Sequence, residues 1–369
     1  MPEQALERAE IVNLAGPRTV FGAATTSPRV AAAVARALRG SYDMERLLDL
    51  AGRRLAAFHE AEAGFLTHCT AGSLTVAAAA CLAGTDMAAV RRLPDTSGLA
   101  RDRILLMRGH DVDFGGLVSQ ALRTSGAGIL AVGGVNRCSE AELDAALADP
   151  RLAGALFVVS PGIESDGLPD LPPFLHLCRR HGVPAIVDAA HLASAVPFLD
   201  AGADLVLLSA QKALGGPTAG ILVGRADLIT ACRAQMAGVG RPVKPTKEAV
   251  AGVLAALDAF PAEAGLRDRR LARRRARLLR LLRRFPGIAL LPAPEETRVR
   301  FSVDTARLGR GAGDIASALA AGRPPVRLRD DRASSGILEI DLSVASPRAF
   351  SLGLAALRAA LEDARRGGS

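Results

Sequence analysis

The segment AIVDAAHLASAVPFLDAGADLVLLSAQKALGGPTAGILVG, residues 185–224, decides the fold of this chain. It holds two short apolar runs, each followed at once by polar residues, and it closes on a third apolar run. The first run ends in Asp188, and the second ends in Ser209 with Lys212 three residues later. This pattern predicts strand, helix, strand, glycine-rich loop and strand. Because ligands of open α/β sheets bind beyond the carboxyl ends of the strands, Asp188 and Lys212 are predicted to face a ligand site.

An acid and a lysine at neighbouring strand ends suit pyridoxal 5'-phosphate (PLP). This cofactor needs a lysine for its Schiff base and an acid that keeps its pyridine nitrogen protonated, so that the ring withdraws electrons. Lys212 and Asp188 are the candidates for these two roles. The alternative is that Asp188 caps a helix and Lys212 is an ordinary surface lysine. Ser209 before the lysine and the glycines after it favour the cofactor.

A second block, GFLTHCTAGSLTVAAAACLAG at residues 64–84, predicts a short strand that turns into an alanine-rich helix. A helix N-terminus with free N–H groups binds phosphate readily. Thr70 and Ser73 would add hydroxyl donors there. An ordinary helix capped by Thr70 explains the same residues equally well.

Strands and helices alternate through the first two thirds of the chain, which predicts a mostly parallel sheet covered on both faces. After about Gly238 the pattern changes to a linker-like turn, two long helical stretches (247–260 and 267–285), and short strands with helices. The later strands are predicted at 299–303, 326–328 and 337–342, and the helices at 312–321 and 348–365. We therefore predict three parts: an N-terminal arm and helix (residues 1–45), a PLP-binding large domain (46–240) and a small C-terminal α+β domain (241–369).

The composition limits the classes of function. The chain has 369 residues, 49% of them apolar, and a net charge of +8 that is concentrated in RDRRLARRRARLLRLLRR at residues 267–284. Leucines at near-helical spacing make this run an amphipathic helix with an arginine-coated outer face. A solvated helix is the preferred interpretation, and a polyanion-binding helix the alternative. Tryptophan is absent and tyrosine occurs once, so no aromatic platform for single-stranded nucleic acid is expected, which argues against a nucleic-acid partner.

The five cysteines are scattered, with no C-x-x-C spacing. They form neither a zinc pattern nor a disulfide framework, so we expect no metal and a reducing, cytoplasmic location. The first ten residues lack the charged and apolar regions of a signal peptide. No apolar run reaches the ~20 residues of a membrane span, so no membrane association is expected.

Motifs of one family occur in order along nearly the whole chain. They are NLAG at 13–16, SP at 27–28, DM at 43–44, LPDT at 93–96, GH at 109–110, VDAA at 187–190, KA at 212–213 with GP at 216–217, and GRP at 240–242 with KE at 247–248. By this ordered set the chain resembles the fold-type I PLP enzymes. More narrowly, it resembles the family of selenocysteine synthase (L-seryl-tRNA selenium transferase) and D-glucosaminate-6-phosphate ammonia-lyase.

The resemblance implies roles for individual residues. Lys212 would form the Schiff base, Asp188 would pair with the pyridinium nitrogen, and His110 would stack on the ring, which makes these three the catalytic candidates. The turn around the phosphate and the strand ends would hold the cofactor. The residues implied there are Cys69, Thr70, Ala71, Ser73, Ala190, Ser209 and Thr218. Thr218 lies in a loop that reaches a partner subunit in this family, so a homodimer with shared sites is expected.

The sequence also departs from the family pattern around the cofactor. His68-Cys69 stands where the family has Ser-Gly, Ala210-Gln211 where it has two glycines, and Asp111 where it has arginine after the histidine. These differences do not change the prediction that PLP is the cofactor, but they leave the identity of the substrate open. An arginine fork is expected for a substrate carboxylate, with Arg241 and Arg329 as candidates and interdomain salt bridges as the alternative.

The predicted activity is a PLP-dependent lyase that performs α,β-elimination on a small polar amino acid. Lys212, once released from the cofactor, would be the general base. The alternatives are an aminotransferase, an aldolase, or a selenium or sulfur transferase acting by β-replacement, including on seryl-tRNA. A further alternative is a homologue that has lost catalysis and serves as a binding partner. The fold by itself does not choose among these.

Overall fold

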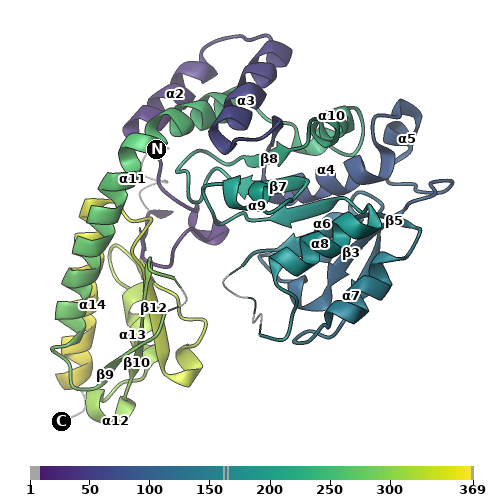
Figure 1. The fold of residues 1–369 in the computed structure, drawn as a ribbon. Helices are drawn as coiled ribbons and strands as arrows, with labels where there is room; N and C mark the ends of the chain where they lie inside the picture. The colour runs from purple at the N-terminus through teal and green to yellow at the C-terminus, as the bar shows by residue number, and fades with distance from the viewer. Residues whose placement is uncertain (1–8, 161–162, 164–165, 294, 367–369) are drawn as a thin grey trace. The chain divides into compact units, whose positions relative to one another are not determined.

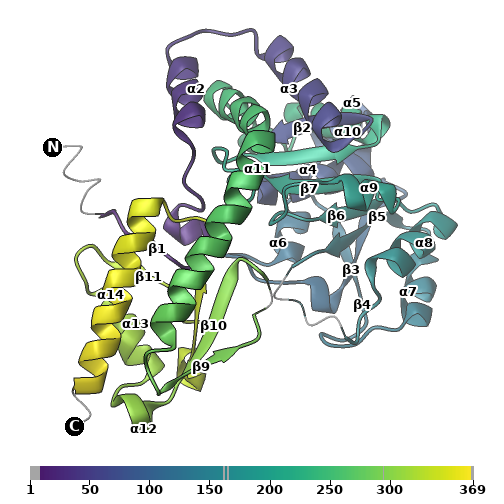
Figure 2. The same ribbon diagram turned by 60° about the vertical axis from the view of Figure 1, so that its left-hand side comes forward.

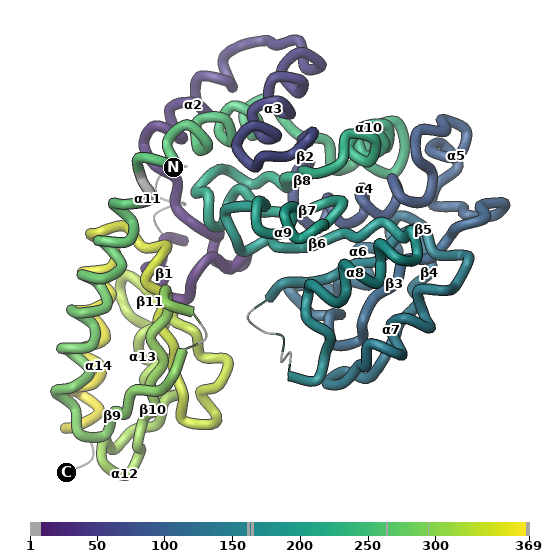
Figure 3. Tube along the Cα trace, viewed as in Figure 1, coloured from purple at the N-terminus to yellow at the C-terminus, as the bar shows by residue number. Residues whose placement is uncertain are grey.

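The structure, a computed structural model, describes residues 9–160, 163, 166–293 and 295–366. The chain forms two compact units (Figures 1 and 3). The central unit comprises residues 26–259, and the terminal unit joins residues up to 25 with residues from 260 onward. These limits differ from the boundaries predicted after residues 45 and 240. The difference arises because β1 (Val12–Asn13) pairs with β11 (Val326–Arg327) in parallel, which ties the N-terminal segment to the C-terminal part of the chain.

The central unit is built on a seven-stranded sheet with the order β2-β8-β7-β6-β5-β3-β4. Five neighbouring strands, from β7 to β4, run parallel, and β8 is antiparallel to both β7 and β2. The mostly parallel sheet is thus confirmed. The strands are β2 (Ala63–Thr67), β3 (Arg103–Met107), β4 (Gly128–Val132), β5 (Leu152–Val158), β6 (Ala185–Asp188), β7 (Leu205–Ser209) and β8 (Gly220–Gly224).

Helices cover this sheet in two groups. In one group α4 contacts α6, α10, β5, β7 and β8, and in the other α7 contacts α8, which packs on β5 and β6 (Figure 2). The α-helices of the central unit before α11 are α2 (Pro28–Leu38), α3 (Met44–His59), α4 (Thr70–Ala83), α5 (Met87–Arg92), α6 (Val118–Arg123), α7 (Glu140–Leu147), α8 (Leu171–His181), α9 (Val196–Asp200) and α10 (Ala226–Ala234). Strands β5 to β8 are buried along their whole length, as expected for continuous apolar runs covered on both faces.

Local signals explain where several of these helices begin. Ser27 precedes α2 and accepts a hydrogen bond from the Val30 amide, and Pro28 fills the first helical position. Asp43 caps α3 through the amides of residues 45 and 46. Ser139 and Glu142 form a capping box at α7. These three helices therefore start where the sequence provides acceptors for unpaired amides.

The terminal unit contains an antiparallel sheet of order β12-β10-β9 and the short β1–β11 pair. Its strands are β9 (Ile288–Leu291), β10 (Arg298–Val303) and β12 (Ile337–Asp341), and its helices include α12 (Thr305–Leu308), α13 (Ala312–Ala320) and α14 (Pro347–Arg366). Its separate core includes Phe301, Phe350 and Leu357. The strand β9 was not predicted, because it alternates poorly and is largely exposed.

One helix, α11 (Lys247–Leu282), spans 36 residues and runs from the central into the terminal unit. Two helical stretches, 247–260 and 267–285, were predicted here; the structure joins them in one element that contains Pro261 and bends between Lys247–Ala262 and Gly265–Leu282. Among the described residues, no single helix has both the length and the apolar composition to cross a membrane, although two halves of α11 taken as a bent pair pass that test.

Candidate active site

Asp188 and Lys212 lie at neighbouring strand ends of the central sheet. Asp188 is the last residue of β6 and pairs in parallel register with Leu207 of β7. β7 ends at Ser209, and the turn that follows is closed by a hydrogen bond from the Lys212 amide to the Ser209 carbonyl, 3.3 Å. The predicted placement of the acid and the lysine therefore follows directly from the strand pairing.

Asp188 and Lys212 lie in a low-dielectric environment, and the charge of each group shifts the pKa of the other. Asp188 is 6% exposed, and burial raises the pKa of its carboxyl to about 6, while the Ala190 amide (3.0 Å from Oδ1) and the positive charge of Lys212 lower it. Burial lowers the pKa of Lys212, and Asp188 partly offsets this. Among the described residues, no guanidinium forms an ion pair with Asp188. Within the part of the chain that the structure describes, the buried carboxylate thus has one direct hydrogen-bond donor.

His110 is held at the same sheet edge. It lies in the single turn Arg108–His110 after β3, and its Nδ1 accepts a hydrogen bond from the Val158 amide at 3.1 Å. Val158 ends β5 and is register-paired with Asp188. Phe157 packs edge-on against the imidazole, with ring centroids 4.4 Å apart. Burial lowers the pKa of His110 to about 4, so the ring is neutral and carries its proton on Nε2.

The turn into α4 differs in detail from the alternative interpretation of this block, a helix capped by Thr70. Cys69, rather than Thr70, is the N-cap, and its Sγ accepts from the Gly72 amide at 3.4 Å. Thr70 is the first helical residue, followed by Ala71, and the Thr70 hydroxyl donates to the Leu208 carbonyl of β7 at 3.3 Å. This contact fixes the first turn of α4 beside the strand that leads to Lys212. The first amides of a helix have no intrahelical acceptor and remain able to bind an anion.

Ser73 and Thr218 have other contacts than those expected of cofactor ligands. Ser73 is fully buried, and its hydroxyl lies 2.8 Å from the Thr67 hydroxyl and 3.5 Å from the Cys69 carbonyl. A Cβ added to Gly220 would lie 2.2 Å from Ser73 Oγ, so this hydroxyl points into the β2–β8 strands. Thr218 is exposed and donates to Gln211 Oε1 at 2.7 Å.

Of the remaining predicted residues, Ser209 is buried at the end of β7 and Ala190 supplies the amide bound to Asp188. Arg241 is exposed in the central unit, and Arg329 is partly buried in the terminal unit. The structure thus brings together Asp188, Lys212, His110 and the α4 turn. No group of three or more potential metal ligands occurs among the described residues.

Sequence reasoning missed the residues that orient these groups. Val158 supplies the amide that fixes His110, Phe157 supports the imidazole, and Gln211 binds Thr218. An apolar strand residue gives no sign that its amide will bind a distant imidazole. Gln211 did stand out, as a departure from the family pattern, but its partner was not predictable from that.

The fold and site define an α/β enzyme of fold type I. The structure superposes on D-glucosaminate-6-phosphate ammonia-lyase with a TM-score of 0.86 and 28% identity, covering 99% of both chains. It also matches serine palmitoyltransferase with PLP internal aldimine at a TM-score of 0.61 and 17% identity, over 95% of this chain and 87% of the other. The second likeness shows the shared fold.

Two sequence relatives match nearly the whole chain. The 5'-C-glycyluridine monooxygenase-decarboxylase of a Streptomyces species is 35% identical over 358 residues, which cover 94% of this chain and 88% of that protein. The D-glucosaminate-6-phosphate ammonia lyase of Salmonella typhimurium is 29% identical over 369 residues, covering 98% of each. No family model matches.

A partial match completes the comparison. The L-seryl-tRNA(Sec) selenium transferase of Geotalea daltonii is 32% identical over 176 residues, 42% of this chain and 37% of that protein. The chain belongs to the PLP-dependent family that contains D-glucosaminate-6-phosphate ammonia lyase, 5'-C-glycyluridine monooxygenase-decarboxylase and the selenium transferases. The resemblance drawn from its ordered motifs is thereby confirmed.

Proposed function

We propose that the chain binds PLP through Lys212 and acts as a lyase that performs α,β-elimination on a small polar amino acid. The observation that carries this proposal is the buried Asp188–Lys212 pair at the ends of adjacent parallel strands. The donor set suits the cofactor, because a buried acid with one direct donor can accept from a pyridinium N–H and a partly desolvated amine can attach to an aldehyde. PLP, when bound, supplies an electron-withdrawing ring.

The chain's own residues have separate tasks in this proposal. Asp188 provides the negative charge that keeps a ring nitrogen protonated, with Oδ1 fixed by the Ala190 amide. Lys212, with its lowered pKa, exchanges a proton with the substrate Cα as general base. His110, a neutral side chain fixed by the Val158 amide, would face the ring of the bound cofactor. The α4 turn at Thr70 and Ala71 holds the phosphate with backbone amides.

The overall reaction balances without a further reactant. Loss of the α-proton and of a β-hydroxyl removes one water, and hydrolysis of the resulting enamine or imine returns that water and releases ammonia. A 3-hydroxy-2-amino acid thereby becomes a 2-keto acid plus ammonia. Arg241 and Arg329 remain the proposed partners of the substrate carboxylate.

The direct test uses the small number of lysines. The sequence has only three, Lys212, Lys244 and Lys247. After incubation with PLP and reduction with borohydride, peptide mass spectrometry should find the pyridoxyl group on Lys212. Lys212→Ala should lose both this label and the visible absorption band, and turnover should fall by at least about 10³-fold. Lys244→Ala, at an exposed position, is the matched control and should keep all three. A label on Lys244 or Lys247, or none, would contradict the proposal.

A second candidate function is oxidative decarboxylation, favoured by the relative that is 35% identical over 94% of this chain. In a balanced form, an α-amino acid and dioxygen give a carboxamide one carbon shorter, carbon dioxide and water. Oxygen uptake with carbon dioxide release would support this function, whereas ammonia and a keto acid without oxygen uptake would support elimination. Dependence on an added keto acid would instead indicate an aminotransferase, and salt-sensitive binding of seryl-tRNA a selenium transferase.

We also propose that the enzyme is a cytoplasmic homodimer. The family resemblance supports a dimer, and five free cysteines in the described chain agree with a reducing compartment. Light scattering coupled to gel filtration measures the oligomeric state directly. A monomer with full turnover would contradict the dimer.

A further inference from the structure

The loop that carries Lys212 continues the pairing of β7 and β8. These strands are antiparallel, and their register ends with Ser209 opposite Gly220. One residue further on, the Ala210 amide donates to the Ala219 carbonyl at 3.0 Å. The two arms of the loop therefore still face each other beyond the last residues of the strands, on the approach to the lysine.

At the next position of this register, side chains make the pairing. Gln211 lies opposite Thr218, and the Thr218 hydroxyl donates to Gln211 Oε1 at 2.7 Å. Facing side chains of an antiparallel pair stabilise it through such hydrogen bonds. Because Gln211 immediately precedes Lys212, the bond closes the loop at the residue before the lysine. The family pattern has glycine at position 211, and glycine has no side chain to form this bond.

Backbone hydrogen bonds fold the rest of the loop onto the same frame. The Gly216 amide donates to the Ala210 carbonyl at 2.8 Å, and the Lys212 amide donates to the Ser209 carbonyl at 3.3 Å. Ala210 is fully buried, so this frame is anchored in the central unit. The backbone of Lys212 is therefore held on one side by a short turn and on the other by the side-chain hydrogen bond.

The hydroxyl of Thr218 has a single proton, and the bond to Gln211 uses it. A cofactor phosphate would have to take that proton away from Gln211 in order to accept a hydrogen bond from Thr218. The lone pairs that remain on the hydroxyl oxygen can only accept, and a phosphate dianion has no donor for them. The observed bond thus favours a role in holding the loop over a role as a phosphate ligand.

We propose that Gln211 is a positioning residue for Lys212, and that it acts with Thr218 by fixing the loop that presents the lysine amine at the end of β7. The task of Lys212 rests on the proposed function, whereas the side-chain bond is a property of the loop itself. Small displacements of a reacting group lower the rate more than they weaken binding of the substrate. Loss of either side chain should therefore have the same consequence.

Amide hydrogen exchange of the full chain, measured with and without bound PLP, tests the bond independently of activity. Gln211→Leu and Thr218→Val should each speed exchange of the peptide that spans residues 210–219 about fivefold, as expected for the loss of one hydrogen bond. The double variant should exchange no faster than either single variant, because both changes remove the same bond. Thr218→Ser keeps the hydroxyl and should exchange at the wild-type rate.

Two further readouts separate a positioning role from a ligand role. Gln211→Leu and Thr218→Val should each lower turnover about threefold, with KM changed by less than about twofold. Their PLP affinities should change equally, by no more than about threefold. Thr230→Val is the matched control, because it removes an equally short hydroxyl bond of 2.7 Å, to the Ala226 carbonyl of α10, at an exposed position. It should leave loop exchange, turnover and PLP affinity unchanged.

Several results would overturn the inference. They are unchanged loop exchange in both single variants, a double variant whose effect is the product of the two single effects, and a Thr218→Ser variant that exchanges as fast as Thr218→Val. PLP binding weakened more than about tenfold by Thr218→Val, but not by Gln211→Leu, would instead identify Thr218 as a phosphate ligand. If borohydride labelling fails at Lys212 while loop exchange follows the expected pattern, the proposed function falls and the Gln211–Thr218 bond stands.

Discussion

Asp188 in the central unit and Asp341 in the terminal unit are both buried carboxylates at the end of a strand, but their surroundings differ. Burial raises the pKa of both. Asp341 accepts hydrogen bonds from the amide and the hydroxyl of Ser343, and Arg298 lies 3.7 Å from its Oδ2. Asp188 accepts one, from the Ala190 amide, and its nearest opposing charge is Lys212. The fold therefore supplies hydrogen-bond donors to the Asp341 carboxylate, whereas the Asp188 carboxylate can still accept hydrogen bonds from a ligand.

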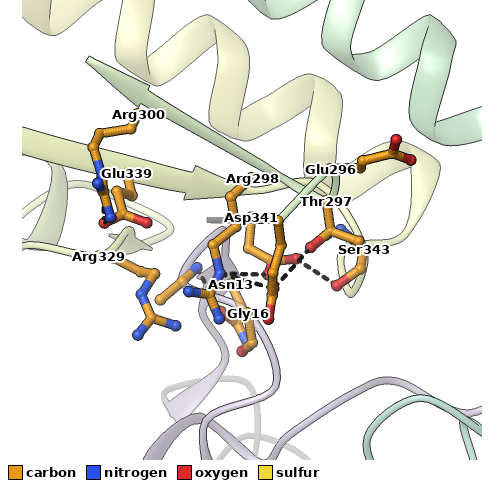
Figure 4. Close-up of polar contacts among 12 residues, drawn as sticks. Asn13, Gly16, Glu296, Thr297, Arg298, Arg300, Arg329, Glu339, Asp341 and Ser343 are labelled. Carbon is orange, nitrogen blue, oxygen red and sulfur yellow. Dashed lines mark hydrogen bonds and ion pairs between the residues drawn. The ribbon is translucent and has the colours of Figure 1, made fainter. Parts of the chain in front are cut away.

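This contrast separates a structural from a functional buried acid. A buried charge with several donors stabilises the elements that supply them, whereas one with few donors is a cost that the fold retains for another reason. Asp341 links β12 to Arg298 of β10, and its carboxylate packs against Gly16 (Figure 4). Among the described residues, the one hydrogen bond to the Asp188 carboxylate comes from its own loop, and its charge partner is Lys212, which agrees with a role toward a cofactor.

The largest expected effect comes from exchanging each carboxylate for alanine. Asp341→Ala leaves the Ser343 donors and Arg298 without their acceptor and should lower the free energy of unfolding by about 3 kcal/mol, with the PLP absorption band retained. Asp188→Ala should lower it by less, about 1 kcal/mol at pH 8, because relief of a desolvated charge offsets part of the lost Ala190 bond and of the lost attraction to Lys212. Its turnover should fall by at least about 10²-fold. Urea unfolding and steady-state kinetics measure both quantities.

The contrast would be broken if the stability losses were reversed, with Asp188→Ala the more damaging. It would also be broken if Asp341→Ala lost the absorption band while remaining folded.

Acid should destabilise the cofactor-free chain through two buried histidines. Burial lowers the pKa of His110 and of His59 to about 4, below the ordinary value of 6.5, so the unfolded chain binds more protons between these values. Stability from this source is complete above pH 6.5 and is lost as the pH falls toward 4, by roughly 3 kcal/mol per histidine at most. Asp188 acts in the opposite sense, since its raised pKa lowers stability as the pH rises from about 4 to 6.

Urea midpoints measured from pH 4 to 8 test this balance. His59→Gln should flatten the acid limb without changing the absorption band, because His59 lies outside the strand-end group and accepts only from the Ala195 amide among the described contacts. An unchanged acid limb in that variant would contradict the assignment.

The smallest effect concerns the turn at Gly16. Gly16 has φ +90°, and a Cβ there would lie 2.8 Å from Asp341 Oδ2, whereas Gly22 has φ +75° with nothing within 4 Å of its added Cβ. Gly22→Ala should cost about 1 kcal/mol from backbone strain alone, and Gly16→Ala about 1 kcal/mol more. Thermal unfolding of the two variants isolates the contribution of the Asp341 contact. Equal costs would show that Asp341 moves aside freely.

The sequence predicted the residues whose position follows from strand ends. Asp188 and Lys212 come directly after apolar runs, and parallel strands bring such ends to one edge. It did not predict the contacts of Ser73, whose hydroxyl lies beside Gly220 and the Thr67 hydroxyl. It also failed for the β1–β11 pair, since two-residue strands more than 300 residues apart carry no periodicity to detect.

The domain limits and the orientation of His110 depend on contacts of the same long-range kind. A backbone amide such as that of Val158 is identical in every strand, so nothing in the residue types shows that it will hold an imidazole. The resemblance to a family located the histidine, and only the fold shows how it is held.

Because lysine is scarce, few side chains of this protein carry an amine that can react with an aldehyde. Nearly all of its 46 basic residues are arginines, and Lys247 already donates to the carbonyls of Leu38 and Gly40. Guanidinium groups stay protonated and do not form a Schiff base with an aldehyde as a lysine amine does. A reactive aldehyde in solution therefore meets few competing side-chain amines, and among the lysines besides Lys212 the exposed Lys244 is the more accessible.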